Sequence, residues 1–182
     1  MIIVLFGAPG VGKGTQAEIL AKTLGMFHLS TGDAFRTAIK NQTEIGMVAK
    51  SYVDGGHLVP DDVTAKNVEE AMKTHGVSNG CILDGFPRTR TQAEALDAIL
   101  SGMGMAVTHV VNLTVDYDTI TQRLLARGRA DDTEQVINNR LQVYENETAP
   151  LIEFYKNRGV LRDVHGLGTV EEVSARILSA VQ

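Results

Sequence analysis

Short apolar runs alternate with longer amphipathic stretches along the 182 residues of the chain. Apolar runs that end at turn residues are typical of buried parallel strands, and we predict them at residues 2–6, 80–84, about 107–115 and about 160–164. Apolar residues at helical spacing predict helices between them. The alternation predicts an α/β fold with a doubly wound parallel sheet. Ligands bind at the carboxyl ends of such strands, where Gly7 and Asp84 fall.

Several helices carry start or stop signals. Residues 31–76 are expected to be mainly helical, with breaks at Gly46, at residues 55–56 and at Pro60. Asp61 is the expected N-cap of the last helix in this stretch, because an aspartate side chain accepts hydrogen bonds from the free amides of a first turn.

Capping signals recur later in the chain. Thr89 and Gln92 have the spacing of a capping box, which predicts a helix through residue 100. Asp132 and Gln135 have the same spacing ahead of a long helix through residue 155. We expect that helix to bend at Pro150, because proline cannot donate the helical hydrogen bond. Further helices are expected at residues 116 to about 127 and from residue 169.

Composition narrows the class of protein. The apolar fraction of 43% and the charged fraction of 21% are ordinary for a globular domain, so residues 1–182 are read as one domain. The net charge of -5 argues against nucleic-acid and membrane partners. The apolar opening stops at Gly7, far short of a membrane span. Cys81 is the only cysteine, so we expect no disulfide and a cytoplasmic location.

Residues 7–15 form a glycine-rich loop, Gly-Ala-Pro-Gly-Val-Gly-Lys-Gly-Thr, that follows a strand and opens a helix. Glycines let main-chain N–H groups turn toward an anion, the helix N-terminus adds partial positive charge, and Lys13 reaches the outer phosphates. The Ser/Thr that usually follows this lysine is Gly14, with Thr15 one place later. The third glycine of a dinucleotide fingerprint is missing where Thr15 stands. The loop predicts nucleoside triphosphate binding, with a plain flexible turn as the alternative.

Two further segments are candidate anion sites. Ser30 or Thr31 is expected to cap a helix whose first turns carry Arg36, and capping is compatible with binding. Asp84 ends a buried strand beside the glycine-rich loop, where a carboxylate can hold Mg²⁺ through water. Arg88 lies on a loop stiffened by proline, so its rigid fork can bind phosphate in a bidentate manner. An exposed turn with a solvated arginine is the alternative.

Four more arginines follow in the second half of the chain. Arg123 and Arg127 share a helix face, Arg129 follows at once, and Arg140 interrupts an apolar stripe where an unpaired charge is costly. With Lys13, Arg36 and Arg88 they make seven cations in an acidic chain. A triphosphate plus a monophosphate carries roughly five to six negative charges at neutral pH, so the cluster predicts two bound nucleotides. The structural alternative is a set of salt bridges with Asp131, Asp132 and Glu147.

These motifs together resemble the adenylate kinases from end to end, and most closely the short bacterial form with a reduced lid. The resemblance rests on residues 7–16, 29–36, 57–59, 84–89, 92, 123, 127–132, 140 and 147–151. It implies the P-loop nucleoside monophosphate kinase architecture, with a doubly wound five-stranded parallel sheet, and a monomer. It also implies a reversible, Mg²⁺-dependent transfer of the terminal phosphate of ATP to AMP, which gives two ADP.

The resemblance further implies a role for individual residues. The ATP site is implied at Gly10, Val11, Gly12, Lys13, Gly14, Thr15, Arg127 and Gly168. The AMP site is implied at Thr31, Arg36, His57, Leu58, Val59, Gly85, Phe86, Pro87, Arg88, Gln92, Arg129 and Arg140. The catalytic cations are implied to be Lys13, Arg88, Arg123, Arg129 and Arg140, with Asp84 holding Mg²⁺ through water.

The resemblance also implies the moving parts. A helical flap of about residues 30–59 closes over AMP, and the lid is only the short turn of about residues 126–132. Longer family members carry an inserted lid, sometimes with four zinc-binding cysteines. Cys81 alone cannot build a zinc site, so we expect no zinc. His57 is expected to supply a main-chain contact and not a base.

Two alternatives stay open at this point. A kinase for UMP, CMP or GMP is the nearest, because only the resemblance makes Gln92 and residues 57–59 favour adenine. A nucleotide-dependent switch is the alternative from another class. The chain lacks the Asn-Lys-x-Asp guanine motif, its one Asp-x-x-Gly at residues 163–166 lies too late, and a switch leaves the second anion site unused.

Overall fold

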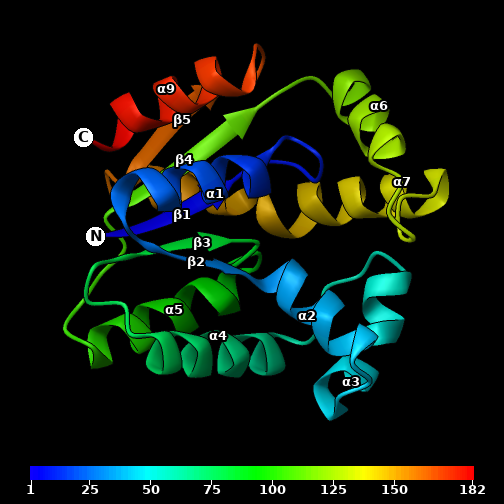
Figure 1. The fold of residues 1–182 in the computed structure, drawn as a ribbon, viewed down its shortest axis with the longest axis horizontal. Helices are drawn as coiled ribbons and strands as arrows, with labels where there is room; N and C mark the ends of the chain where they lie inside the picture. The colour runs from blue at the N-terminus through cyan, green and yellow to red at the C-terminus, as the bar shows by residue number, and fades with distance from the viewer.

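The computed structural model describes all of residues 1–182. Five parallel strands form one sheet in the order β2-β3-β1-β4-β5, so the predicted five-stranded parallel sheet is confirmed (Figure 1). The strands are β1 Ile2–Phe6, β2 Phe27–Ser30, β3 Cys81–Asp84, β4 His109–Thr114 and β5 Leu161–His165.

Helices cover both faces of the sheet and extend beyond its carboxyl edge (Figure 1). One face packs against α1 Lys13–Leu24 and α9 Val170–Val181. The other face packs against α4 Asp61–His75, α5 Arg90–Gly102 and α8 Pro150–Lys156. Past the strand ends lie α2 Thr31–Lys40 and α3 Glu44–Asp54, and across from them α6 Tyr117–Arg127 and α7 Glu134–Val143. No helix has the length and apolar character needed to cross a bilayer.

Strand β1 supplies residues to both halves of the core. Ile3 and Leu5 pack on the α1–α9 side, whereas Ile2, Val4 and Phe6 pack on the other side, and all five are buried. Successive side chains of a strand point to opposite faces, so a strand covered on both faces is apolar throughout. The loop that follows β1 therefore starts from a rigid support.

The apolar pattern does not predict β2. Two of its four residues are polar, and only Leu29 is buried. β2 is an edge strand that pairs with β3 alone, with Phe27 opposite Cys81 and Ser30 opposite Asp84. This pairing places the start of α2 beside the end of β3.

The expected helix break at Gly46 is wrong. α2 ends at Lys40 and α3 begins at Glu44, so the break falls at residues 41–43 and Gly46 lies inside α3. A Cβ on Gly46 would clash with the carbonyl oxygen of Ala38 in α2. The glycine serves close helix packing and not chain reversal. The breaks at residues 55–56 and at Pro60 agree with the structure.

Two expected N-caps are also wrong. Pro60 is the N-cap of α4, and Asp61 is its first helical residue. Thr133 caps α7 in place of Asp132, and it accepts a hydrogen bond from the Val136 N–H at 3.4 Å. Both aspartates instead accept hydrogen bonds from side chains outside their own helix. Competing tertiary partners therefore override the local capping signal.

The long helix expected through residue 155 is divided. α7 ends at Val143, residues Tyr144–Thr148 form a π-helix, and α8 begins at Pro150. Proline at a first helical position sacrifices no helical hydrogen bond, so the irregularity falls ahead of the proline. Thr148 is buried in the π-helix and donates a hydrogen bond to the Arg88 carbonyl oxygen at 2.8 Å.

Candidate active site

The loop between β1 and α1 has the geometry of an anion cradle. Gly7, Gly10 and Gly12 have φ angles of 135°, 87° and 111°, a region that favours glycine. A Cβ on Gly7 would lie 2.5 Å from the carbonyl oxygen of Leu113 in β4. Gly12 is the N-cap of α1 and offers no side-chain acceptor, so the first N–H groups of the helix are free for an anion.

Lys13 folds back into this loop. Its Nζ donates hydrogen bonds to the carbonyl oxygens of Gly7 at 2.7 Å and Ala8 at 3.1 Å. Burial lowers the pKa of Lys13 from 10.5 to about 8, although nearby Asp84 acts in the opposite direction. A phosphate beside the ammonium group would favour its charged form and raise this pKa.

Asp84 ends β3 next to the glycine-rich loop. A Cβ on Gly14 would lie 3.5 Å from Oδ2 of Asp84, so the carboxylate faces the start of α1. The chain has no group of three or more His, Cys, Asp or Glu side chains arranged to hold a metal ion. A single carboxylate beside a phosphate loop fits Mg²⁺, which keeps several waters and takes one or two carboxylates together with substrate phosphates.

Arg88 is held in place through the main chain around it. Its Nε donates to the Gly85 carbonyl oxygen at 2.8 Å, and the Thr31 hydroxyl donates to the same oxygen at 2.9 Å. Burial, and then repulsion from Arg140, lowers the pKa of Arg88 to about 10, while Asp84 opposes this shift. The guanidinium therefore keeps its charge at neutral pH. A fixed, desolvated cation of this kind binds oxyanions strongly.

The remaining arginines approach from α6, the following turn and α7. Arg123 donates to the Val11 carbonyl oxygen of the glycine-rich loop at 3.3 Å. Arg127 donates to both carboxylate oxygens of Asp132, from Nε at 2.8 Å and from Nη2 at 2.6 Å. Arg129 lies 3.8 Å from the carboxylate of α2 residue Asp33.

Arg140 completes the cluster from α7. Its Nη1 lies 3.1 Å from Asp131 and 3.4 Å from Asp132. Burial lowers the pKa of Arg140, with Asp131 opposing this and Arg127 adding to it. The salt bridges considered as a structural alternative are therefore present for Asp131 and Asp132, whereas Glu147 makes none.

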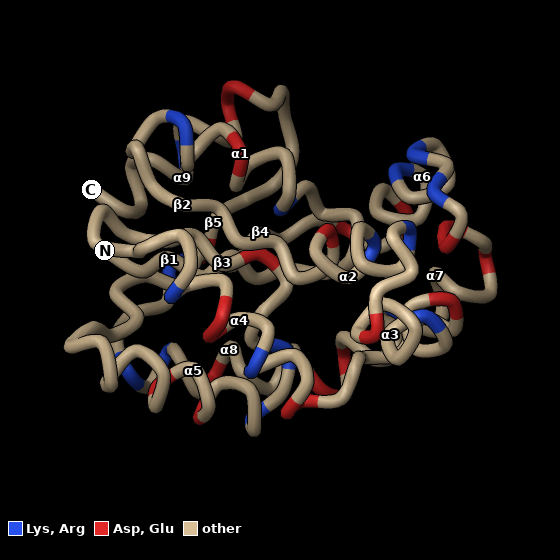
Figure 2. Tube along the Cα trace, turned by 60° about the horizontal axis from the view of Figure 1, so that its bottom comes forward, with Lys and Arg blue, Asp and Glu red and all other residues tan.

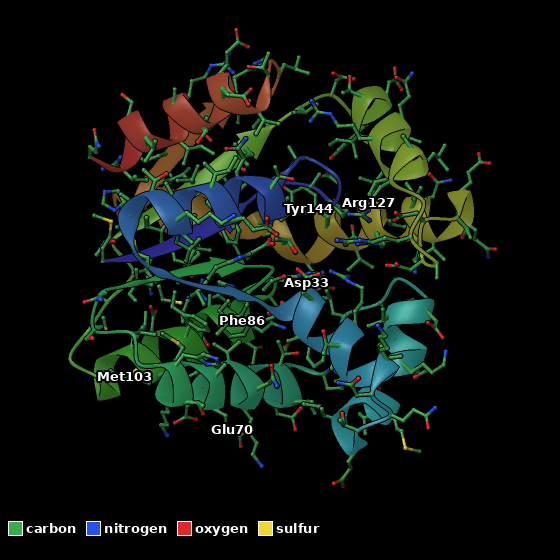
Figure 3. All side chains as sticks on the ribbon, viewed as in Figure 1. Asp33, Glu70, Phe86, Met103, Arg127 and Tyr144 are labelled. Carbon is green, nitrogen blue, oxygen red and sulfur yellow. The ribbon has the colours of Figure 1, made fainter.

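The charged side chains described above line one cavity of about 530 Å³. All seven predicted cations line it, together with Asp84 and every residue expected at the ATP site. Figure 2 shows Lys and Arg positions gathered with Asp and Glu positions where α2, α6 and α7 meet. In Figure 3, Asp33 lies on one side of this region and Tyr144 and Arg127 lie on the other, whereas Glu70 and Met103 are far from it.

A second cavity of about 70 Å³ adjoins the first under α2 and α3. Arg36, Arg88 and Arg140 line both cavities. Most residues expected at the AMP site lie here, namely Thr31, Arg36, His57, Leu58, Val59, Gly85, Arg88, Gln92 and Arg140. Pro87 and Arg129 line the larger cavity. Phe86 lines neither cavity, and its side chain is 1% exposed and packs into the core.

Other lining residues are absent from the sequence-based prediction. Tyr144 and Thr148 reach the larger cavity from the π-helix, and Val170 reaches it from the start of α9. The buried Nε2 of His28 in β2 lies 4.0 Å from Asp84 and has no hydrogen-bond partner. The π-helix has no sequence signature, and His28 belongs to the strand that the apolar pattern misses.

The structure combines a parallel sheet, a glycine-rich phosphate loop after its first strand and a second small cavity beneath α2 and α3. These are the features of a P-loop nucleoside monophosphate kinase. The family model for adenylate kinase matches residues 5–160 of the chain. Adenylate kinases of Mycobacteroides abscessus and Rhodococcus erythropolis are each 49% identical over 181 residues, which cover 100% of this chain and 99% of each relative. An adenylate kinase of Geobacter sp. is 45% identical over 213 aligned positions, which cover 100% of both chains. The chain belongs to the adenylate kinase family and is a phosphotransferase.

Proposed function

We propose that this protein transfers the terminal phosphate of Mg²⁺-bound ATP to AMP, reversibly, to give two ADP. The observation that carries the proposal is that seven cations line one cavity in a chain of net charge -5. A single triphosphate carries about four negative charges and a monophosphate adds about two, given a second phosphate pKa near 6. Two nucleotides match the cluster better than one.

The ATP phosphates are proposed to bind in the loop after β1. Main-chain N–H groups between Gly10 and Thr15 and the Lys13 ammonium are proposed to supply the contacts, with Arg127 at the outer end. Gly168 lines the same cavity from the loop before α9, and it is proposed to contact the nucleoside. Asp84 is proposed to hold Mg²⁺ through water, and the ion would supply charge neutralisation at the phosphates.

AMP is proposed to occupy the smaller cavity and the space it shares with the larger one. Arg36, Arg88 and Arg140 reach that shared space, so they are the proposed partners of the AMP phosphate, with Arg129 beyond them. Thr31, Gln92 and the segment His57 to Val59 line the smaller cavity, where they would surround the nucleoside. Gly85 and the main chain of residues 86–87 would complete the floor.

The proposed mechanism needs no general base. An AMP phosphate oxygen is already largely ionised at neutral pH, so catalysis rests on alignment and on stabilisation of the moving charge. The charge on the phosphoryl group would be stabilised, as it moves from donor to acceptor, by Lys13, Arg88, Arg123, Arg129 and Arg140. Closure of the flap would exclude water, which otherwise takes the phosphate.

The proposed parts are a core with the loop of residues 7–15, an AMP-binding flap of about residues 30–59 and a short lid of about residues 126–132. The Arg127–Asp132 ion pair spans that lid turn. We further propose that the protein acts as a monomer in the cytoplasm.

A coupled assay with ATP and each of AMP, UMP, CMP and GMP tests the proposal. We expect turnover with AMP far above the other three, and a higher turnover with UMP, CMP or GMP would assign another acceptor. Titration with a bisubstrate of two adenosines joined by five phosphates should give one tight site per chain that excludes both ATP and AMP. Saturable ATP binding without any AMP binding would refute the transfer.

A further inference from the structure

The side-chain amide of Gln92 has half of its hydrogen-bonding capacity occupied within the protein. Gln92 is 2% exposed and lines the smaller cavity. Its Oε1 accepts a hydrogen bond from the Arg88 N–H at 2.7 Å, and its Nε2 donates one to Oδ1 of Asp61 at 2.8 Å. An amide has two N–H donors and two acceptor lone pairs, so one of each remains for a ligand.

These two partners fix which way the amide is turned. The Arg88 main-chain N–H can only donate, and the Asp61 carboxylate oxygen can only accept. A flipped Gln92 amide would oppose donor to donor at Arg88 and acceptor to acceptor at Asp61. Both contacts would then be lost inside a buried site, where unpaired polar groups are costly.

Asp61 is itself held in place. Its Oδ2 accepts a hydrogen bond from the Thr89 hydroxyl at 3.0 Å. Thr89 caps α5 and accepts the Gln92 N–H at 3.1 Å, so the three residues close a ring of hydrogen bonds. Asp61 is also the first residue of α4, and a helix N-terminus stabilises a carboxylate.

We propose that Asp61 is a positioning residue that sets nucleobase specificity by fixing the orientation of the Gln92 amide, an inference that rests on the proposed function. The edge of a 6-aminopurine carries an acceptor at N1 and a donor at the exocyclic amine. A 6-oxopurine carries a donor at N1 and an acceptor at O6. An amide that can turn suits either base, whereas a fixed amide suits one and leaves mismatched polar groups with the other.

The test compares Asp61→Asn with Asp62→Asn. Asp62 is exposed, lies in the same first turn of α4 and makes no side-chain hydrogen bond, so it controls for the lost charge. Asparagine at position 61 can donate as well as accept, so it removes the acceptor-to-acceptor conflict that disfavours a flipped Gln92 and leaves only the Arg88 N–H to oppose the flip. The ratio of kcat/KM for AMP to kcat/KM for IMP should fall about tenfold in Asp61→Asn and stay unchanged in Asp62→Asn, with KM for ATP unchanged in both.

A double variant tests the route of the effect. In a Gln92→Ala background, Asp61→Asn should change the AMP-to-IMP ratio no further. An equal loss of kcat/KM for AMP and IMP in Asp61→Asn, or an effect that persists without Gln92, would overturn the inference. A wild-type enzyme that fails to phosphorylate AMP would instead refute the proposed function, so the two failures are distinguishable.

Discussion

Replacement of Arg88 by alanine should separate catalysis from stability. Arg88 lines both cavities, and its guanidinium has no carboxylate within salt-bridge distance. Its only side-chain hydrogen bond is the 2.8 Å contact with Gly85. One such bond is worth about 1 kcal/mol to folding, and loss of the repulsion from Arg140 offsets part of this. A cation at a transferring phosphoryl group is worth about 10³–10⁵ in rate, or about 4–7 kcal/mol of barrier at 1.36 kcal/mol per decade.

Turnover at saturating ATP and AMP should therefore fall by at least about a thousandfold, while the free energy of unfolding changes by about 1 kcal/mol. A coupled ADP assay and urea denaturation measure the two effects. Arg123→Ala should behave in the same way. Arg90→Ala is the matched control, because Arg90 is exposed two residues away and pairs with Glu94 on the surface. Turnover of Arg88→Ala within tenfold of the wild type would refute the reasoning, as would a loss that merely follows the folded fraction.

Three further predictions each concern one residue. Burial lowers the pKa of Lys13 to about 8, so the free enzyme loses the positive charge of Lys13 as the pH rises through that value. Above it, kcat/KM for ATP should fall about tenfold per pH unit. A kcat/KM that does not change with pH would contradict this. Asp132→Asn should lower the free energy of unfolding at neutral pH by about 3 kcal/mol, because the Asp132 side chain is 0% exposed and holds Arg127. Burial raises the pKa of Asp132, but the hydrogen bonds from Arg127 outweigh it and hold the pKa below 3.8. This stabilisation is thus present above about pH 4 and is lost as the pH falls through the lowered pKa, so denaturation at acid pH should show a smaller difference between variant and wild type. Asn139→Asp should raise KM for AMP about fivefold and leave KM for ATP unchanged. The reason is that Nδ2 of Asn139 donates a hydrogen bond to the carbonyl oxygen of Gly55, in the proposed flap, at 2.6 Å, and a carboxylate cannot. Asn138→Asp, at an exposed position of α7, is the control.

Elements with strong local signals were predictable from the sequence. β1 is apolar at every position because it is covered on both faces, and the glycine-rich loop after it needs glycine for three positive φ angles. Thr89 caps α5 as predicted, although the Gln92 side chain accepts a hydrogen bond from the Arg88 N–H and so does not complete the expected capping box. The misses depend on partners distant in the chain. β2 is stabilised by pairing with β3, and a glycine is required at position 46 because α2 packs directly against it. Neither the strand pairing nor the helix packing leaves a local pattern in the sequence.

The same division applies to the site. The gathering of the seven cations was predictable, because phosphate binding demands positive charge, and the structure brings all seven to one cavity. Residues that orient the binding groups were not. Asp61 reads as an ordinary helix cap in the sequence, and no motif singles out Asn139. Their partners are Gln92 and Gly55, which lie 31 and 84 positions away in the chain.

The ion pairs of the arginine cluster and its proposed phosphate binding are compatible, and burial decides how each pair behaves. The Asp132 side chain is 0% exposed, whereas that of Asp33 is 56% exposed. Breaking the buried pair would leave an uncompensated charge, so Asp132 is expected to keep Arg127 in a fixed orientation whether or not nucleotide is bound. The Asp33–Arg129 pair, at 3.8 Å near the surface, is worth little, and a doubly charged phosphate with three acceptor oxygens is the stronger partner. AMP binding should therefore release Arg129 from Asp33 and leave the Asp132 pair intact, which couples the flap to the lid turn through one exchangeable contact.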